Sequence, residues 1–302
     1  MAELKIDAVV FDVLGTLVDE PAGLRAGIRA LLDEPAGLRT GIRAPADEPA
    51  GLRTGIRAPA DEPAGPRTGI RAPADEPAGL RTGIRAPVDE LAGLRTGVRA
   101  PDPSPDAPDA AGTERLLLLW QRHIEREQRR VLDGDRPYLP SDLLDREAAG
   151  LVAEAAGVQD PAAVEALARS ARRLPPWPDT VAGLARIAGR FPLIGLSNAS
   201  RTALLGLNAH AGLRWHQALS AEDARTYKPD PAVYRLAVTG SGAPPERLLM
   251  VAAHAWDLRG AQALGLRTAY VARPVGDPPS SSDRFDLYAE GLADLAGQLG
   301  VS

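Results

Sequence analysis

The pattern of hydrophobic positions changes along this chain of 302 residues and marks two kinds of structure. Short apolar runs that are typical of buried strands occur near the start and again in the second half, where segments with helical spacing separate them. We expect strands at 6–11, 191–196, 217–219, 248–252 and 267–271, and helices at 179–188, 200–209, 231–238 and 258–264. Strands that alternate with helices predict an α/β fold with a doubly wound parallel sheet.

Residues 113–173 have a helical pattern without strand-like runs. Four residues with three prolines, Pro175-Pro176-Trp177-Pro178, follow this stretch and end it. Because the helical stretch interrupts the sheet pattern after its first strand, we predict an inserted helical cap at 103–174. The α/β core then consists of residues 1–18 and 175–302.

Six copies of a 14-residue unit, close to DEPAGLRTGIRAPA, occupy residues 19–102. The copies begin at Asp19, Asp33, Asp47, Asp61, Asp75 and Asp89. Each could form a short helix with Asp as N-cap and Pro in the first turn, but the glycines in every copy and the proline at the end of most copies oppose one long helix. We favour a mobile, partly helical insertion, and keep a packed helical array and a binding module as alternatives. The first copy lacks the closing proline and reads as the parent helix of the others.

Composition excludes several classes of protein. The chain has no cysteine, which excludes disulfides and thiolate chemistry. Its net charge of −5, with both signs interspersed, gives no basic surface for nucleic acid or anionic lipid. No apolar run approaches the roughly 20 residues that a membrane span needs. The first residues lack a basic segment followed by an apolar stretch, so we expect a cytoplasmic protein.

Polar residues follow four of the expected strands at their carboxyl ends. They are Asp12, Ser197, Asn198, Lys228, His254 and Asp257. A single Asp after a strand is more often a helix cap, but four polar sites at the edge where open parallel sheets bind ligands indicate one shared site. Lys228 is also one of two lysines among 35 basic residues, and an ammonium is a compact charge whose pKa depends on its surroundings.

These residues fall in four motifs that resemble those of the haloacid dehalogenase superfamily. The motifs are Phe11-Asp12-Val13-Leu14-Gly15-Thr16-Leu17, Leu196-Ser197-Asn198, Tyr227-Lys228-Pro229-Asp230 and His254-Ala255-Trp256-Asp257. Order and spacing agree over residues 1–18 and about 112–300, whereas the repeats have no counterpart. The resemblance implies the superfamily's Rossmann-like core with an inserted helical cap.

Two departures from the superfamily's phosphatases place the chain nearest to its type II (S)-2-haloacid dehalogenases. Leu14 stands where a phosphatase has the Asp that protonates the leaving oxygen, and Ala253 stands where it has an Asp that helps to hold Mg²⁺. Halide leaves without a proton, and Mg²⁺ requires several oxygen ligands. We therefore expect no metal and no cofactor. Tyr234 and Trp256 also match the dehalogenases.

The resemblance implies a two-step displacement on a small haloacid, with Asp12 as nucleophile and an aspartyl ester as intermediate. Lys228 would favour the anionic form of Asp12, and Thr16 and Ser197 would orient its oxygens. Asp257 would position or deprotonate the water that attacks the ester, with a possible relay through the neighbouring histidine.

The expected substrate-binding residues come from both the core and the cap. They are Leu14, Asn198, Tyr234, His254, Trp256, Gln121 and Arg122. Asn198 and the backbone amides after the second strand would hold the substrate carboxylate or the halide. For His254, packing beside Trp256 is the alternative. The dehalogenases have an Arg where this chain has Gln121, and moving to Arg122 turns a side chain by about 100° on a helix.

Three functions remain open. Hydrolysis of a short 2-haloacid to the 2-hydroxy acid is favoured. The others are a hydrolase of the same fold acting on another substrate, such as a phosphate ester, and a weakly active protein whose repeats bind a partner. The resemblance also implies a homodimer through the cap.

Overall fold

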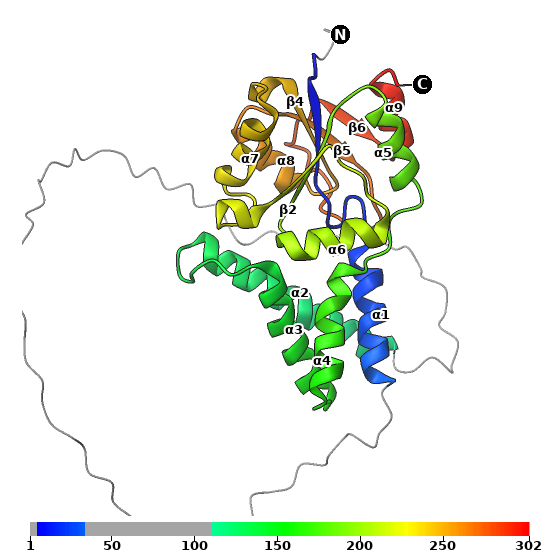
Figure 1. Cartoon of the computed structure of the whole chain (residues 1–302), viewed down its shortest axis with the longest axis vertical. Coiled ribbons are helices and arrows are strands. Elements are labelled where there is room, and N and C mark those ends of the chain that lie inside the picture. Colours follow the sequence, from blue (N-terminus) through cyan, green and yellow to red (C-terminus); the bar gives the residue numbers. More distant parts are fainter. Residues whose placement is uncertain (1–4, 34–109, 302) are drawn as a thin grey trace, which may run out of the picture. The chain divides into compact units, whose positions relative to one another are not determined.

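The computed structural model describes residues 5–33 and 110–301, and its core is a six-stranded sheet in which every strand pairing is parallel (Figure 1). The strands are β1 (Ala8–Phe11), β2 (Leu193–Ser197), β3 (Gln217–Ser220), β4 (Leu248–Ala252), β5 (Arg267–Val271) and β6 (Leu287–Ala289). Their order is β3-β2-β1-β4-β5-β6, so the chain winds to both sides of β1. This confirms the predicted doubly wound parallel sheet, and the switch point lies between β1 and β4.

Helices cover both faces of the sheet. One face packs against α5 (Thr180–Ala188), α6 (Arg201–Ala211) and α9 (Leu292–Gln298), and the other against α7 (Pro231–Ser241) and α8 (Ala255–Ala263). Val9 and Phe11 of β1 belong to the first core, and Ala8 and Val10 to the second. The strand is apolar throughout because both of its faces are buried.

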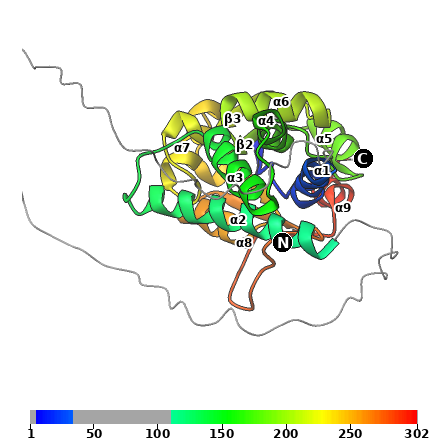
Figure 2. The same ribbon diagram turned by 90° about the horizontal axis from the view of Figure 1, so that it is seen from below.

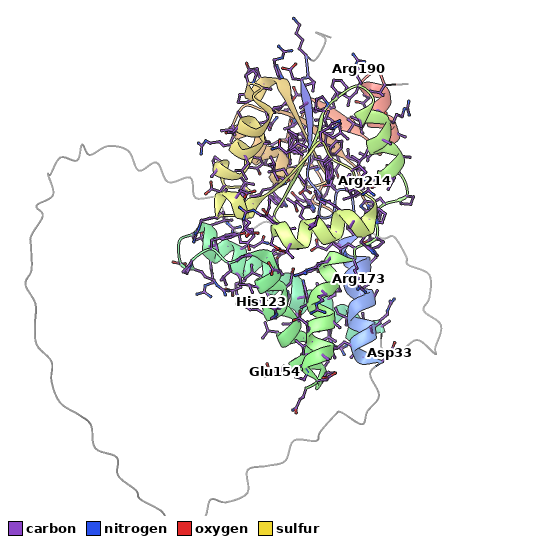
Figure 3. The ribbon with its side chains drawn as sticks, in the orientation of Figure 1. Asp33, His123, Glu154, Arg173, Arg190 and Arg214 are labelled. Carbon is purple, nitrogen blue, oxygen red and sulfur yellow. The ribbon has the colours of Figure 1, made fainter. Side chains whose placement is uncertain are left out.

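The final strand and helix were not predicted. β6 has three residues and α9 has seven, and neither length produces a clear hydrophobic period. Long-range contacts hold this end in place: Arg190, labelled in Figure 3, donates to the carbonyl oxygens of Leu299 and Gly300, both at 2.9 Å. Two short 3₁₀ turns, η3 (Ala221–Ala224) and η4 (Pro245–Arg247), complete the core.

Four helices form the cap, which Figure 2 views from below. They are α1 (Glu20–Leu32), α2 (Ala110–Leu132), α3 (Ser141–Ala156) and α4 (Pro161–Ala168), followed by the 3₁₀ turn η2 (Arg169–Arg172). Leu24, Ile28 and Leu31 of α1 are buried in a third apolar core, which they share with α2, α3 and α4. α2 carries charges along its 23 residues, and none of the helices in the described ranges is long and apolar enough to cross a membrane.

The first copy of the repeat is therefore a helix of the cap. Asp19 caps α1 by accepting a hydrogen bond from the amide of Ala22 at 3.0 Å, as the repeat pattern predicts. Gly27 lies so close to α4 and η2 that an added Cβ would approach the Ser170 Cβ to 2.7 Å. The later copies, and the boundary at residues 102 and 103, lie outside the described residues.

Two backbone segments connect the core and the cap. Val18 and Pro176 form an antiparallel bridge, and the amide of Asp19 donates to the carbonyl of Pro175 at 2.8 Å. The amide of Ser200, after β2, donates to Ser141 Oγ at the start of α3, also at 2.8 Å. The site expected at the carboxyl ends of the strands thus lies beside the cap.

Candidate active site

Asp12 lies directly after β1, with a backbone amide that donates to the carbonyl of Val251 in β4 at 2.9 Å. Its side chain is buried and both carboxylate oxygens are bound. Oδ1 accepts from Lys228 Nζ at 2.9 Å, and Oδ2 accepts from Thr16 Oγ1 at 2.7 Å. Thr16 Oγ1 in turn accepts from the amide of Ala253 at 2.9 Å, so the hydroxyl proton must point to Asp12. The carboxylate is fixed in one orientation.

Lys228 joins Asp12 to a second buried carboxylate. Its Nζ donates to Asp257 Oδ2 at 2.7 Å, while the Tyr234 hydroxyl donates to Asp257 Oδ1 at 2.7 Å. Burial alone would lower the pKa of Lys228, but the charges of Asp12 and Asp257 outweigh it and raise that pKa. Burial raises the pKa of Asp257 despite the attraction of Lys228. The arrangement is one ammonium shared by two carboxylates in a site of low solvent access.

Two backbone amides after β2 donate to serine side chains. The Ala199 amide donates to Ser197 Oγ at 3.1 Å, and the Ser200 amide donates to Ser141 Oγ at 2.8 Å. Both amides, which were expected to hold a substrate anion, therefore have acceptors within the protein, and anion binding at this loop stays a prediction. Ser197 is fully buried, and within the described ranges no hydrogen bond joins it to Asp12.

The expected substrate-binding residues differ in their placement. Asn198 lies at the site: its Oδ1 accepts from the backbone amide of Lys228 at 2.8 Å, which leaves its NH₂ group for a ligand. Gln121 is half-buried and Arg122 is exposed, both on α2. Across residues 5–33 and 110–301, no hydrogen bond or ion pair connects Gln121 or Arg122 to Asp12, Lys228 or Asp257.

His254 packs against the loop that follows Asp12. Its Nε2 lies 3.3 Å from the carbonyl oxygen of Leu14, and its ring centroid lies 5.8 Å from that of Trp256. Gly15, at φ +76°, leaves room for this ring, since a Cβ there would lie 2.5 Å from Nε2. Trp256 is 36% exposed. The packing role considered for His254 is thus present, at the edge of the site.

Two residues of the site were not predicted. Glu20, the first residue of α1, is close enough for its pKa to respond to the site: burial raises that pKa, the charge of His254 lowers it and the charge of Asp12 raises it. Arg273 contacts the loop that follows Asp12, donating from Nε to the Thr16 carbonyl at 2.8 Å. The repeat hid Glu20 because the same residue recurs in every copy, and no local signal marks Arg273.

The residues present do not suit Mg²⁺. Leu14 and Ala253 offer no oxygen from their side chains, and Asp12 and Asp257 are already bridged by the ammonium of Lys228. Within the part of the chain that the structure describes, no group of three or more His, Asp or Glu residues is placed to hold a metal ion. The ammonium of Lys228 supplies the positive charge between the two carboxylates.

Comparisons with known proteins bear on this site. Residues 6–265 match the haloacid dehalogenase-like hydrolases. The (S)-2-haloacid dehalogenase 1 of Pseudomonas sp. (strain CBS-3) is 31% identical over 165 residues, 53% of this chain and 72% of that protein. The (S)-2-haloacid dehalogenase 4A of Burkholderia cepacia is 30% identical over 174 residues, 56% of this chain and 74% of that protein.

Coverage differs among the relatives. The match to (S)-2-haloacid dehalogenase H-109 of Pseudomonas putida, 32% identical over 117 residues, spans 38% of this chain and only 52% of that protein. The crystal structure of the L-2-haloacid dehalogenase PA0810 superimposes with a TM-score of 0.66 at 29% identity and covers 98% of this chain and 100% of that one. The resemblance predicted from the four motifs is confirmed, and the chain belongs to the haloacid dehalogenase-like hydrolases.

Proposed function

We propose that this protein hydrolyses short 2-haloalkanoic acids to 2-hydroxy acids through an ester on Asp12, without a metal ion. The observation that carries the proposal is the set of hydrogen bonds that hold the Asp12 carboxylate. Asp12 accepts hydrogen bonds from Lys228 and Thr16, and Leu14 stands where a phosphatase needs an acid. The curated relatives above are named (S)-2-haloacid dehalogenases, which supports the same reaction class.

In the first step an oxygen of Asp12 attacks the carbon that carries the halogen. The new carbon–oxygen bond forms as the carbon–halogen bond breaks, and the halide departs with the bonding electron pair. Attack from the face opposite the halogen inverts that carbon. Lys228 and Thr16 fix the attacking carboxylate, so little reorientation is required before reaction.

In the second step water attacks the carbonyl carbon of the Asp12 ester. Asp257 accepts the proton of that water, the ester's carbonyl–oxygen bond breaks, and the product leaves as the 2-hydroxy acid after its oxygen takes up the proton. A raised pKa suits Asp257 to proton acceptance near neutral pH, and Tyr234 and Lys228 hold its carboxylate in place. Asp12 is restored, and the net products are hydroxy acid, halide and one proton.

The NH₂ group of Asn198 is our candidate for contact with the substrate carboxylate. Ser197 supports the loop that presents Asn198, because its Oγ accepts a hydrogen bond from the backbone amide of Ala199. Gln121 and Arg122 of α2, with Leu14 and Trp256, are proposed to line the approach to the nucleophile. Cytoplasmic location and a homodimer through the cap also stay predictions.

Halide release tests the proposal. Full-length protein should release chloride from 2-chloropropionate in the presence of EDTA, and Asp12→Asn should abolish that release. Asp133→Asn, an exposed position at the end of α2, is the matched control and should retain activity. Turnover of an aryl phosphate that depends on Mg²⁺, without halide release, would favour a phosphate-ester hydrolase of the same fold instead.

Two observations favour a second candidate, a hydrolase of the same fold that acts on a less anionic substrate. Glu20 brings a carboxyl group close to Asp12, and Gln121 stands where the related dehalogenases have an Arg. Both features weaken the attraction for a substrate carboxylate. Faster halide release from 2-chloropropionamide than from 2-chloropropionate, with the same dependence on Asp12, would select this candidate.

A further inference from the structure

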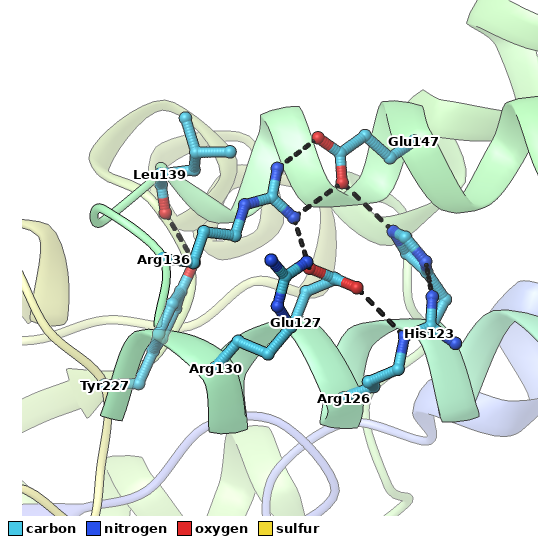
Figure 4. Close-up of polar contacts among 8 residues, drawn as sticks. All are labelled: His123, Arg126, Glu127, Arg130, Arg136, Leu139, Glu147 and Tyr227. Carbon is cyan, nitrogen blue, oxygen red and sulfur yellow. Dashed lines mark hydrogen bonds and ion pairs between the residues drawn. The ribbon is translucent and has the colours of Figure 1, made fainter. Parts of the chain in front are cut away.

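A network of charged side chains around one buried glutamate of the cap lies outside the proposed reaction, and Figure 4 shows it. Glu127 of α2 is 4% exposed and accepts hydrogen bonds from three arginines: Arg126 at 2.9 Å, Arg130 at 2.9 Å and Arg136 at 2.6 Å. Burial alone would raise the pKa of Glu127, but the hydrogen bonds from Arg126 and Arg136 outweigh it and lower that pKa to about 2. The carboxylate is therefore charged at neutral pH.

Arg136 extends this network to the next helix. It lies in the segment between α2 and α3, and donates to Glu147 of α3 from Nη2 at 2.5 Å and from Nη1 at 3.1 Å. His123 of α2 lies 3.1 Å from the same carboxylate through Nε2, and Arg126 donates to its Nδ1 at 2.8 Å. A guanidinium bound to two carboxylates fixes the segment that follows it.

That segment contacts Tyr227 of the core. The Tyr227 hydroxyl donates to the carbonyl oxygen of Leu139 at 2.6 Å, three residues after Arg136. Tyr227 is fully buried, and its ring centroid lies 5.2 Å from that of Tyr138. Burial raises the pKa of Tyr227, so the phenol stays protonated as a donor.

Tyr227 immediately precedes Lys228, the residue shared by the two buried carboxylates. The Lys228 backbone amide is held on the core side by Asn198 Oδ1 at 2.8 Å. Its preceding residue is held on the cap side by Leu139. The backbone that carries the ammonium is thus held between the loop after β2 and the cap.

We propose that Tyr227 is a positioning residue that holds Lys228 in place through Leu139 of the cap, and that the Arg136 network acts on Lys228 through this hydrogen bond. Small displacements of a reacting group lower the rate, because reaction requires the atoms to lie in contact and in line. The cap then helps to position the Lys228 ammonium at Asp12. That last consequence rests on the proposed function, whereas the mechanical link does not.

Hydrogen exchange of the Lys228 amide measures the link without a substrate. Tyr227→Phe should raise the exchange rate of this amide in the full chain by roughly fivefold to tenfold, since it removes one neutral hydrogen bond. Arg136→Met should also raise it. If the network acts through Tyr227, the double variant should exchange no faster than Tyr227→Phe alone.

Arg146→Met is the matched control, because Arg146 makes an exposed ion pair with Glu165 at 3.0 Å on another side of α3. It should leave Lys228 exchange unchanged. Should Arg136→Met unfold the cap, Glu147→Gln tests the same arm with a milder change. Unchanged exchange in Tyr227→Phe, or effects of the two single variants that multiply in the double variant, would overturn the proposal.

Turnover gives a second readout. Tyr227→Phe should lower kcat for halide release more than it raises KM, because the ammonium of Lys228 contacts Asp12, whereas only its backbone amide contacts Asn198. A lowered kcat with unchanged exchange would contradict positioning. Altered exchange in a protein that releases no halide would leave the link intact and reject the proposed reaction.

Discussion

Replacing Lys228 by methionine should destabilise the protein strongly at neutral and alkaline pH. Its side chain is 1% exposed, and its partners Asp12 and Asp257 are 8% and 0% exposed. Removing one partner of a buried ion pair costs about 3–5 kcal/mol, because the remaining charge stays in a medium of low dielectric constant. Two carboxylates lose their only shared ammonium here, so we expect a loss of at least about 3 kcal/mol in the free energy of unfolding at about pH 8.

The loss should shrink in acid. Without the ammonium, burial and the charge of Asp12 raise the pKa of Asp257 further above its unfolded value near about 3.9. A group whose pKa is raised on folding binds protons more readily in the folded state, so its contribution to stability is present below the unfolded pKa and is lost as the pH rises through the folded pKa. Relative to the wild type, Lys228→Met should therefore be more stable at about pH 5 than at about pH 8.

Urea unfolding followed by circular dichroism at both pH values provides the measurement. The double variant Lys228→Met/Asp257→Asn should recover part of the loss at about pH 8, because one buried charge is gone. Arg146→Met, in an exposed pair, should cost less than about 1 kcal/mol. A loss below about 1 kcal/mol for Lys228→Met, or an equal loss at both pH values, would refute the reasoning.

Three further predictions concern the cap. Glu127→Gln should lower the free energy of unfolding by about 2 kcal/mol at neutral pH, and this difference should shrink as the pH falls from 4.5 toward about 2. A difference that does not depend on pH in urea unfolding would contradict the lowered pKa of Glu127. Gly27→Ala should destabilise the protein by about 1–3 kcal/mol, because the new Cβ would meet Ser170 at 2.7 Å. Gly150→Ala on α3 places its Cβ in open space and should stabilise the protein by roughly 0.5–1 kcal/mol. Equal effects of the two variants in thermal unfolding would reject the close packing of α1. Deletion of residues 33–102 should preserve the melting temperature and halide release, since the first copy supplies the helix that the cap core uses, and loss of either would give the later copies a necessary role.

The sequence was sufficient to predict the sheet and its central residues. Strands buried on both faces produce continuous apolar runs, and the carboxyl ends of neighbouring parallel strands converge, so Asp12, Lys228 and Asp257 could be expected together before any contact was known. β6 was missed because three residues leave no period to detect. The short length of β6 therefore limited its prediction more than the strand preference of its residues did.

Long-range packing explains the parts of the site that were not predicted. Ser141 belongs to the cap and lies far from Ser200 in the sequence. No local pattern therefore predicts that its hydroxyl accepts a hydrogen bond from the Ser200 amide. Arg273 reaches Thr16 across the sheet in the same way. Glu20 was concealed by its own repetition, because a residue that recurs in every copy looks like a property of the repeat.

The central claim is that Asp12 itself forms a covalent ester during turnover. A single turnover of 2-chloropropionate, with enzyme in excess and in water labelled with heavy oxygen, tests it most directly. We predict unlabelled 2-hydroxypropionate from this first turnover and heavy oxygen in the Asp12 carboxylate, detected by mass spectrometry of the peptide that contains it. Labelled product together with an unlabelled Asp12 peptide would contradict the account.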